Sequence, residues 1–359
     1  MTRAVEARVS LGALRHNLNR VNTRATNAKV IAIIKADGYG HGMVAVAQAL
    51  AAADAFGVAC VEEAVILREA GVTKKILLLA GFFDATELPL IDRYELDCVV
   101  HHAYQVGLLQ EARLSQPINI WLKIDTGMHR LGIAPGALQS TYAALAASSN
   151  VKQPLRLMSH FASADDLMSG QTAEQLTRFD QLTSALPGEQ SLANSAAILA
   201  WPQSHRHWVR PGVMLYGVSP FAQRVGTELD LRPVMTLTSR IMAINRYPLG
   251  AAIGYGATWV CPEAMAVGVV AIGYGDGYPR HAKVGTPVLI HGRRALIVGR
   301  VSMDSICIDL RGHPEALIGD EVILWGEGLP VEEVAQHADT IPYELLCKVT
   351  PRTRFRYTA

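Results

Sequence analysis

The first two-thirds of the chain alternate short apolar runs with amphipathic stretches, and this alternation restricts the possible folds more than any other feature. The apolar runs are continuous, which is typical of strands in a parallel sheet covered on both faces. Helical spacing fits the intervening stretches 42–53, 62–70, 137–147 and 174–186. The expected strands are 30–34, 56–59, 76–80, 98–100, 118–124, 155–159 and 191–193, with 213–216 as the eighth.

Eight strand–helix units spaced about 20 to 40 residues apart predict a (β/α)₈ barrel of the TIM type. A doubly wound open sheet uses similar units and is the alternative. After about residue 220, the sequence changes to short β-branched runs separated by Gly, Pro and Asp, at 265–272, 286–291, 296–301, 306–310 and 321–325.

Dense short strands of this kind predict a C-terminal mainly-β domain, a sandwich or a barrel. The predicted fold class is therefore α/β, with an N-terminal barrel followed by a mainly-β domain. We expect the barrel to cover residues 1–225 and the β domain to cover residues 226–359. The boundary should lie between Gly217 and Pro233.

The composition favours a globular protein that acts on a small molecule. Half of the 359 residues are hydrophobic, 18% are charged, and the net charge is +1. Binding to nucleic acid or to a membrane surface requires a basic excess or stripe, so neither is expected. The five cysteines form no CxxC pair, which argues against a disulfide framework or a zinc site.

Neither a secretion signal nor a membrane span is expected. The first residues lack the continuous apolar core of a signal peptide, and no run reaches the roughly 20 apolar residues that cross a bilayer. His205 and His207 form an H-x-H pair, but no acidic or cysteine partner lies at ligand spacing, so no metal is predicted. These features predict a cytoplasmic protein.

Lys35 directly follows the first apolar strand, at the end where barrel enzymes gather their functional groups. Partial desolvation there would lower the pKa of the ammonium group and favour the neutral amine that forms Schiff bases. The alternative is a lysine that only marks the solvent end of the strand. The glycine-rich segment after it matches neither a Walker A loop nor a dinucleotide fingerprint.

Residues 32–42, with Lys35 followed by ADGYGHG, closely resemble the cofactor-lysine motif of bacterial alanine racemases. The resemblance covers almost the whole chain, because further motifs occur in the same order. These are WLKIDTGMHRLG at 121–132, SHF at 159–161, WVRPGVMLYGV at 208–218, GYGAT at 254–258, GYGDGYPR at 273–280, VGRVSMD at 298–304 and YEL at 343–345.

The resemblance implies a racemase that interconverts L- and D-alanine with pyridoxal 5′-phosphate held as a Schiff base on Lys35. Such an enzyme supplies D-alanine for peptidoglycan synthesis or serves alanine catabolism. The family's fold, a barrel followed by a β domain, agrees with the pattern of the sequence. The resemblance also implies a head-to-tail homodimer, in which each active site includes residues from the partner's C-terminal domain.

The resemblance implies two catalytic bases, because inverting a stereocentre requires proton transfer on both faces. Lys35 would serve one face, and Tyr255 of the partner subunit would serve the other. Because free tyrosine has a pKa of about 10, it needs a neighbour that lowers its pKa or shares its proton. By the family pattern, His160 links this tyrosine to Arg210, which hydrogen-bonds the pyridine nitrogen and leaves that nitrogen unprotonated.

Binding roles also follow from the resemblance. Arg130 and the backbone of Met303 would bind the substrate carboxylate, since the planar guanidinium can donate two parallel hydrogen bonds. Lys123 matches a lysine that is often carbamylated and then holds Arg130; an unmodified lysine paired with an acid is the alternative. The residues implied for the phosphate are Tyr39, Ser195, Gly212, Val213 and Tyr343, and those implied for the entry corridor are Tyr274, Tyr278 and Arg300.

Two other functions are alternatives to the racemase. A decarboxylase of the same architecture would place an acidic residue at the pyridine nitrogen and a cysteine-containing motif in the second domain. A non-catalytic pyridoxal phosphate carrier would lack the C-terminal domain. Arg210 and Tyr255 argue against the first, and the complete second domain argues against the carrier.

Overall fold

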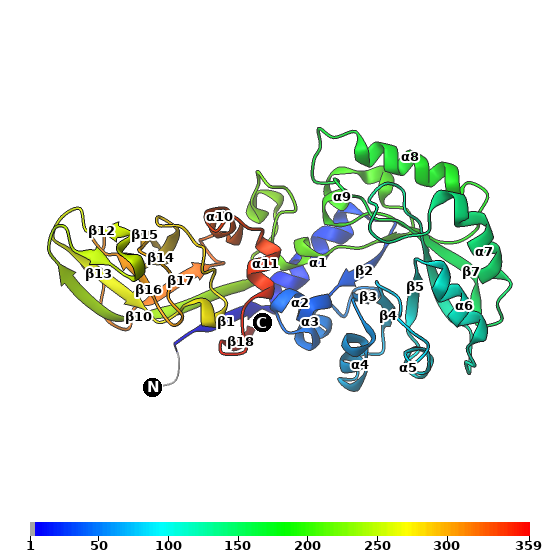
Figure 1. The fold of residues 1–359 in the computed structure, drawn as a ribbon, viewed down its shortest axis with the longest axis horizontal. Coiled ribbons are helices and arrows are strands. Elements are labelled where there is room, and N and C mark those ends of the chain that lie inside the picture. Colours follow the sequence, from blue (N-terminus) through cyan, green and yellow to red (C-terminus); the bar gives the residue numbers. More distant parts are fainter. Residues whose placement is uncertain (1–3) are drawn as a thin grey trace.

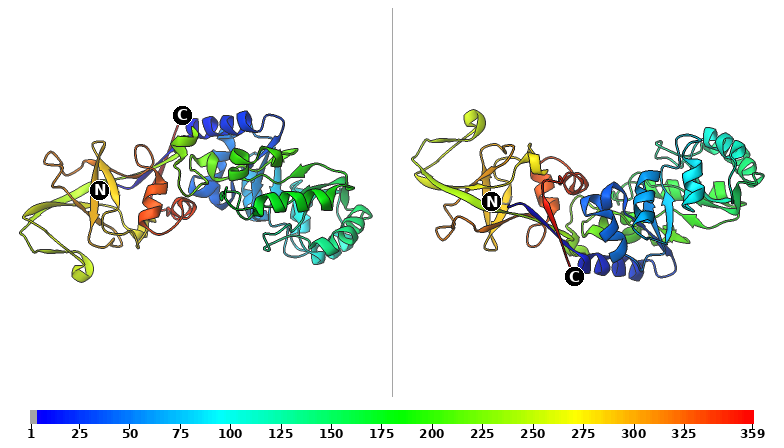
Figure 2. Two further views of the ribbon diagram at one scale, coloured as in Figure 1. Left: turned by 90° about the horizontal axis from the view of Figure 1, so that it is seen from above. Right: turned by 90° about the horizontal axis from the view of Figure 1, so that it is seen from below.

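A computed structural model describes residues 4–359 as two bodies joined end to end (Figure 1). An α/β barrel forms one end of the molecule and a mainly-β domain forms the other, and this elongated shape is evident from two further sides (Figure 2). Within residues 4–359, no helix combines the length and the apolar character needed to span a bilayer.

Eight parallel strands close into the N-terminal barrel. Each strand pairs with the next one along the chain, and the last pairs with the first. The predicted barrel is therefore confirmed, and the alternative of an open sheet is wrong. The strands are β2 (Lys29–Ile33), β3 (Ala55–Val58), β4 (Lys75–Leu78), β5 (Asp97–Val100), β6 (Ile118–Lys123), β7 (Val151–Met158), β8 (Gln190–Ser191) and β9 (Trp208–Val209).

Helices cover the outside of the barrel (Figure 1). Four of them occupy stretches where the sequence predicts helices: α3 (Met43–Ala49), α4 (Val61–Glu69), α7 (Leu138–Ala146) and α8 (Gln171–Thr183). The others are α1 (Leu11–Arg24), α2 (Lys35–Gly40), α5 (Leu88–Arg93), α6 (Ala103–Glu111) and α9 (Ser195–Ala200).

The eighth strand differs from the prediction. It is β9, whereas the predicted strand 213–216 forms a 3₁₀ helix, η3 (Val213–Tyr216). The four residues of η3 are all buried, and the Tyr216 hydroxyl donates to the carbonyl of Ile33. A short run buried on every side shows no periodicity, so the sequence could not separate a strand from a helical turn. Gly217, with φ of 83°, ends the turn.

The second domain is mainly β, as predicted. Its largest sheet has the order β13-β16-β15-β14-β17-β10-β1-β18, and β10 also pairs with β13, so six of the strands form a closed ring. Two short helices, α10 (Val331–His337) and α11 (Pro342–Cys347), lie beside the barrel. The strands are β1 (Glu6–Ser10), β10 (Met235–Tyr247), β13 (Met265–Val270), β14 (Pro287–Ile290), β15 (Arg293–Val298), β16 (Ile306–Asp309), β17 (Glu321–Trp325) and β18 (Arg354–Thr358), with the separate hairpin β11 (Ala252–Ile253) and β12 (Trp259–Val260).

Strand β1 belongs to this second sheet although it precedes the barrel in the chain. It pairs antiparallel with β10 and parallel with β18. The sequence placed residues 6–10 with the barrel, because pairing between segments more than 200 residues apart leaves no local signal. The division of the chain at 225/226 stays a prediction.

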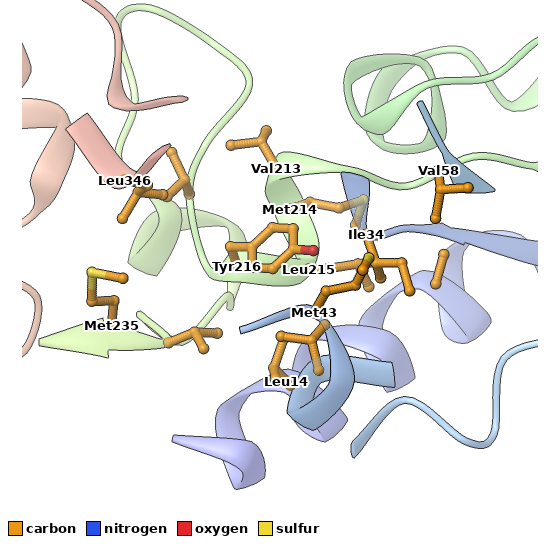
Figure 3. Packing of buried hydrophobic residues seen from close by; sticks show 14 of the residues in the cluster. Leu14, Ile34, Met43, Val58, Val213, Met214, Leu215, Tyr216, Met235 and Leu346 are labelled. Atoms are coloured by element: carbon orange, nitrogen blue, oxygen red, sulfur yellow. The ribbon is translucent and has the colours of Figure 1, made fainter. Parts of the chain in front are cut away.

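One hydrophobic cluster runs through the junction of the two bodies (Figure 3). Tyr216 lies between Met235 and Leu346 of the second domain and Leu14 and Ile34 of the barrel. Because protein interiors are closely packed, this shared core fixes the position of α11 beside the barrel mouth.

The amino ends of the barrel strands hold a network of paired charges, which we call the barrel floor (Lys29, Asp97, Arg156 and Glu189). Arg156 donates to Asp97 at 2.8 Å and to Glu189 at 3.2 Å. Lys29 pairs with Glu189 at 2.6 Å. The Arg156 guanidinium also lies against the rings of Trp121 and Trp208. Every charge of the floor thus has an opposite partner.

Candidate active site

A cavity of about 810 Å³ opens at the carboxyl ends of the barrel strands, between the barrel and helices α10 and α11. Barrel enzymes place their sites at this end. The cavity brings together the predicted residues from the barrel and one from α11. These are Lys35, Tyr39, Lys123, Arg130, His160, Ser195, Arg210, Gly212, Val213 and Tyr343.

Lys35 lies one residue beyond the end of β2 and begins a left-handed helical turn. Residues 36–39 have φ between 51° and 62°, although only Gly38 is a glycine. Left-handed geometry costs a residue with a side chain roughly 1–2 kcal/mol. Strain of this kind persists where surrounding contacts enforce it, and such places are often functional sites.

Two carboxylates stabilise the left-handed turn. Glu63 accepts hydrogen bonds from the backbone N–H of Ala36 and of Ala59, each at 2.7 Å. Asp37 accepts one from Met43 at 2.7 Å. Glu63 was not predicted from the sequence, because its only local signal is its place in the first turn of the helix that follows β3.

Two glycines of the lysine motif allow the second domain to approach this turn. A Cβ on Gly40 would lie 2.2 Å from the carbonyl oxygen of Leu346 in α11. One on Gly42 would lie 2.0 Å from the Tyr357 hydroxyl in β18. The backbone of Leu346 cannot give way, so glycine is required at position 40. At position 42 the Tyr357 side chain could move, and there the φ of 86° is what favours glycine.

Positive groups surround Lys35. Its side chain is accessible from the open cavity, but burial by the remaining walls lowers the pKa of the amine, and Arg130 lowers it further. Glu63 opposes this effect. Burial, with Arg210 and Arg130 nearby, lowers the pKa of Lys123 to about 8. Both lysines therefore form the neutral amine more readily than a free lysine does.

Arg210 is buried and held by four acceptors. It donates to the Ser191 hydroxyl and to the Ser159 carbonyl, both at 2.7 Å, and to Leu192 at 3.2 Å. Its Nη2 atom also lies 3.2 Å from Nδ1 of His160. Burial lowers the pKa of Arg210 to about 10, so it stays charged near neutral pH. Burial and then the Arg210 charge lower the pKa of His160 well below its usual range, so the imidazole is neutral.

The residues predicted for the phosphate form one wall of the cavity. Ser195 Oγ accepts from the backbone N–H of Gly212 at 2.9 Å, and a Cβ on Gly212 would lie 2.6 Å from the Tyr39 hydroxyl. Burial raises the pKa of Tyr39, and it raises that of Tyr343 to about 12. Both phenols therefore keep their protons and can donate to an anion.

The remaining predicted residues lie on the second domain and do not line the cavity. The side chains of Tyr255 and Met303 are 68% and 52% exposed. Tyr274 lies beside Met303, because the amides of residues 274 and 275 donate to the carbonyls of residues 302 and 303. The Arg300 side chain lies over Gly256, next to Tyr255. These four residues thus form an exposed group of their own, which we call the second-domain group.

Tyr278 does not have its predicted place. It is 1% exposed and stacks on Trp325 in the core of the second domain, with ring centres 5.9 Å apart. The expectation that it lines an entry corridor is therefore wrong. Its motif GYGDGYPR contains two tyrosines, and sequence alone does not show which of them faces solvent.

The fold and the cavity together define a class of protein. It is an α/β-barrel enzyme with a reactive strand-end amine among anion-binding donors, extended by a β domain that carries a separate exposed group of polar and aromatic residues.

Comparison with known proteins narrows this class to one family. The model for the alanine racemase N-terminal domain matches residues 9–220, and the model for the C-terminal domain matches residues 234–357. The chain belongs to the alanine racemase family.

Individual relatives agree. An alanine racemase from Nitrosococcus oceani is 53% identical over 348 residues, 97% of each chain. One from Shewanella sp. (strain MR-4) is 50% identical over 346 residues, 96% of this chain and 97% of the relative. The crystal structure of the biosynthetic alanine racemase from Pseudomonas aeruginosa superposes with a TM-score of 0.97 at 45% identity, covering 99% of this chain and 100% of that one.

Proposed function

We propose that this protein is a cytoplasmic enzyme that interconverts L- and D-alanine with pyridoxal 5′-phosphate bound to Lys35. The main support is the Lys35 amine, whose pKa is lowered and which lies in a cavity also lined by Arg130 and Arg210. A neutral amine is the form that reacts with the cofactor aldehyde. Membership of the family supplies the substrate and the reaction.

The cavity fits a phosphorylated ring. The hydroxyls of Tyr39, Tyr343 and Ser195 and the amides of Gly212 and Val213 would hold the phosphate. Arg210 would donate a hydrogen bond to the ring nitrogen, and because it stays charged it would leave that nitrogen unprotonated. The bound cofactor withdraws electrons from the substrate α-carbon and so acidifies the α-proton. His160, kept neutral, accepts from Arg210 at Nδ1, so its proton lies on Nε2, from which it can donate a hydrogen bond to a neighbouring group.

We propose two bases on opposite faces of the substrate, Lys35 and Tyr255 of the partner subunit, in a head-to-tail homodimer. The exposure of the second-domain group supports this arrangement, since large apolar side chains gathered on a surface mark an interaction site. Met303 of the partner subunit would bind the substrate carboxylate together with Arg130. Tyr274 and Arg300 would border the entry.

Carbamylation of Lys123 fits the charges of the site. Carbon dioxide adds to a neutral amine and one proton is released, and a pKa of about 8 provides that neutral amine. The resulting anion would hold Arg130 for the substrate carboxylate. An unmodified lysine paired with an acid is the alternative, and the mass of the intact protein in carbonate buffer distinguishes the two.

Racemisation of L-alanine, followed by loss of optical rotation with and without added cofactor, tests the function. We expect cofactor-dependent racemisation of alanine and slower turnover across a panel of larger amino acids, because a small pocket excludes an added methylene sterically. Bound cofactor without loss of rotation would contradict the proposal and favour a carrier. Requirement of the host for D-alanine after gene deletion separates a role in peptidoglycan synthesis from one in catabolism.

Mixed dimers test the sharing of sites. A Lys35→Ala chain and a Tyr255→Phe chain are each expected to be nearly inactive. After subunit exchange, hybrids should regain activity, because one of their two sites has both bases. No recovery, with exchange proven by mass spectrometry, would contradict the shared site.

A further inference from the structure

Glu332 lies where the second domain meets the chain that leaves the barrel. It is the second residue of α10, which stands at the junction of the two bodies (Figure 1). Facing it is the segment 217–234, which connects η3 to β10 and which we call the connecting loop. The Glu332 residue is only 7% exposed, so its carboxylate needs partners in the protein.

Both partners are backbone amides of the connecting loop. Oε1 of Glu332 accepts from Ser219 N and from Gly226 N, each at 2.9 Å. Burial raises the pKa of Glu332, while these two donors lower it. The loop is closed tightly at this point, since a Cβ on Gly226 would lie 2.0 Å from the carbonyl oxygen of Gly217. One oxygen atom thus holds two positions of the connecting loop, residues 219 and 226, against α10.

This link forms part of the wall of the candidate active site. Glu332, Ser219 and residues 220–222 line the cavity. The connecting loop continues from η3, whose first residue, Val213, is one of the residues predicted to bind the phosphate. Helix α10 packs on α11, which carries Tyr343 and packs on α2 behind Lys35. Glu332 therefore joins the loop that follows Val213 to the helix that packs against α11, which carries Tyr343.

A second cavity adjoins this link. Its volume is about 180 Å³, and it is lined by Gly226 and by Glu332, which also lines the first cavity. Atoms that border a cavity lack part of the packing contacts of a filled interior, so the two hydrogen bonds of Glu332 add to the positioning of this link. The link is therefore expected to affect how well the cofactor site is preorganised.

We propose that Glu332 is a positioning residue for the cofactor. It holds the connecting loop against α10, which packs on α11, and thereby sets the distance between Val213 and Tyr343, two residues predicted to bind the phosphate from opposite domains. This inference rests on the proposed function, because it presumes that the wall binds pyridoxal phosphate. Glu332 itself need not touch the cofactor.

Titration of the apoenzyme with pyridoxal phosphate alone, without alanine, tests this inference. Loss of two hydrogen bonds to a charged group in Glu332→Ala should raise the dissociation constant about tenfold. Glu332→Gln should stay within about twofold of wild type, because its amide oxygen can accept the same two bonds. Glu333→Gln is the matched control, since that neighbour pairs with Arg294 on the surface and should leave the affinity unchanged.

A merely structural role would give a different result. Glu332→Ala would then melt at a lower temperature but bind the cofactor as tightly as wild type, which would overturn the proposal. Equal weakening in Glu332→Gln and Glu332→Ala would overturn the hydrogen-bonding account. If the alanine variant does not fold, Glu332→Asp replaces it, because the shorter carboxylate cannot reach both amides, and unchanged affinity in that variant would overturn the proposal too.

The two proposals fail in different ways. A wild-type apoenzyme that does not bind pyridoxal phosphate would overturn the proposed function and this inference together. Tight binding by wild type and equally tight binding by a folded Glu332→Ala protein would overturn only the role of Glu332. Hydrogen exchange at residues 219 and 226 gives a second readout, and we expect faster exchange in the alanine variant than in Glu333→Gln.

Discussion

The two ends of the barrel treat charge in opposite ways. At the floor, Arg156 and Lys29 pair with Asp97 and Glu189. At the mouth, Lys35, Lys123, Arg130 and Arg210 converge on one cavity, and burial together with mutual repulsion lowers the pKa of both lysines. Paired charges stabilise the fold, whereas gathered like charges destabilise it until an anion binds. This difference assigns stability to the floor and chemistry to the mouth.

The largest expected effect separates the two ends of a single strand. Lys35→Ala should lower racemase activity by about 10³-fold or more, because it removes both the cofactor amine and a base. Lys29→Ala, at the other end of β2, is the control and should keep nearly wild-type activity. Steady-state kinetics at saturating cofactor measure both, and equal losses would contradict the division of roles.

The next largest effect concerns a residue of the barrel floor, and it changes stability instead of activity. Arg156→Ala leaves Asp97 buried without its main partner and should lower the free energy of unfolding by about 3 kcal/mol. Activity per folded molecule should not change. Urea unfolding measures the loss, and Arg206→Ala, which removes an exposed pair with Asp180, should cost less than about 1 kcal/mol. Equal costs in the two variants would show that the floor is no more than a surface network.

Lys123, at the mouth of the barrel, should contribute more to the stability of the folded protein as the pH becomes alkaline. The pKa of Lys123 is about 8 in the folded protein and near its usual value of 10.5 when unfolded, so between these pH values the unfolded chain binds more protons. Its contribution to stability therefore rises with pH through this window. The melting temperature of wild type, compared with that of Lys123→Met in buffer free of carbon dioxide, should increase with pH through this window. A flat difference would contradict the lowered pKa.

Glu189, in the barrel floor, should contribute less to the stability of the folded protein in acid, and this is the smallest expected effect. Burial raises the pKa of Glu189, but hydrogen bonds from Lys29 and Trp208 outweigh it and bring the value to about 2. Its contribution is complete above pH 4.5, the usual value, and is lost as the pH falls toward 2. Glu189→Gln should remove part of the acid sensitivity of the melting temperature, and an unchanged acid profile would argue against the pairing.

The sequence predicted much of the fold because the barrel is built from local units. Seven of the eight strands and four of the barrel helices follow from runs of residues that are close in the chain. The 3₁₀ helix η3 escaped prediction, since four buried residues carry no period. Strand β1 escaped as well, because its partners β10 and β18 lie more than 200 residues away.

The candidate site divides in the same way. Motifs around Lys35, Arg210 and Tyr255 are local in sequence and were identified by resemblance. Glu63 and Glu332 were not, because each acts through backbone amides of a distant segment and acidic residues are common at the starts of helices. The second domain's approach to Gly40 and Gly42 likewise has no local signal, although it explains why the motif contains glycine there.

The sequence by itself determined the barrel, the mainly-β domain, the family resemblance and the strand-end lysine. These depend on periodicity and on motif order, which short-range chemistry encodes. The tertiary structure alone decided which residues share the cavity, and it left Tyr255 exposed on the other domain. It also decided that a carboxylate on α10 accepts hydrogen bonds from two amides of the connecting loop. Such contacts are set by how the chain closes on itself, and no local pattern records them.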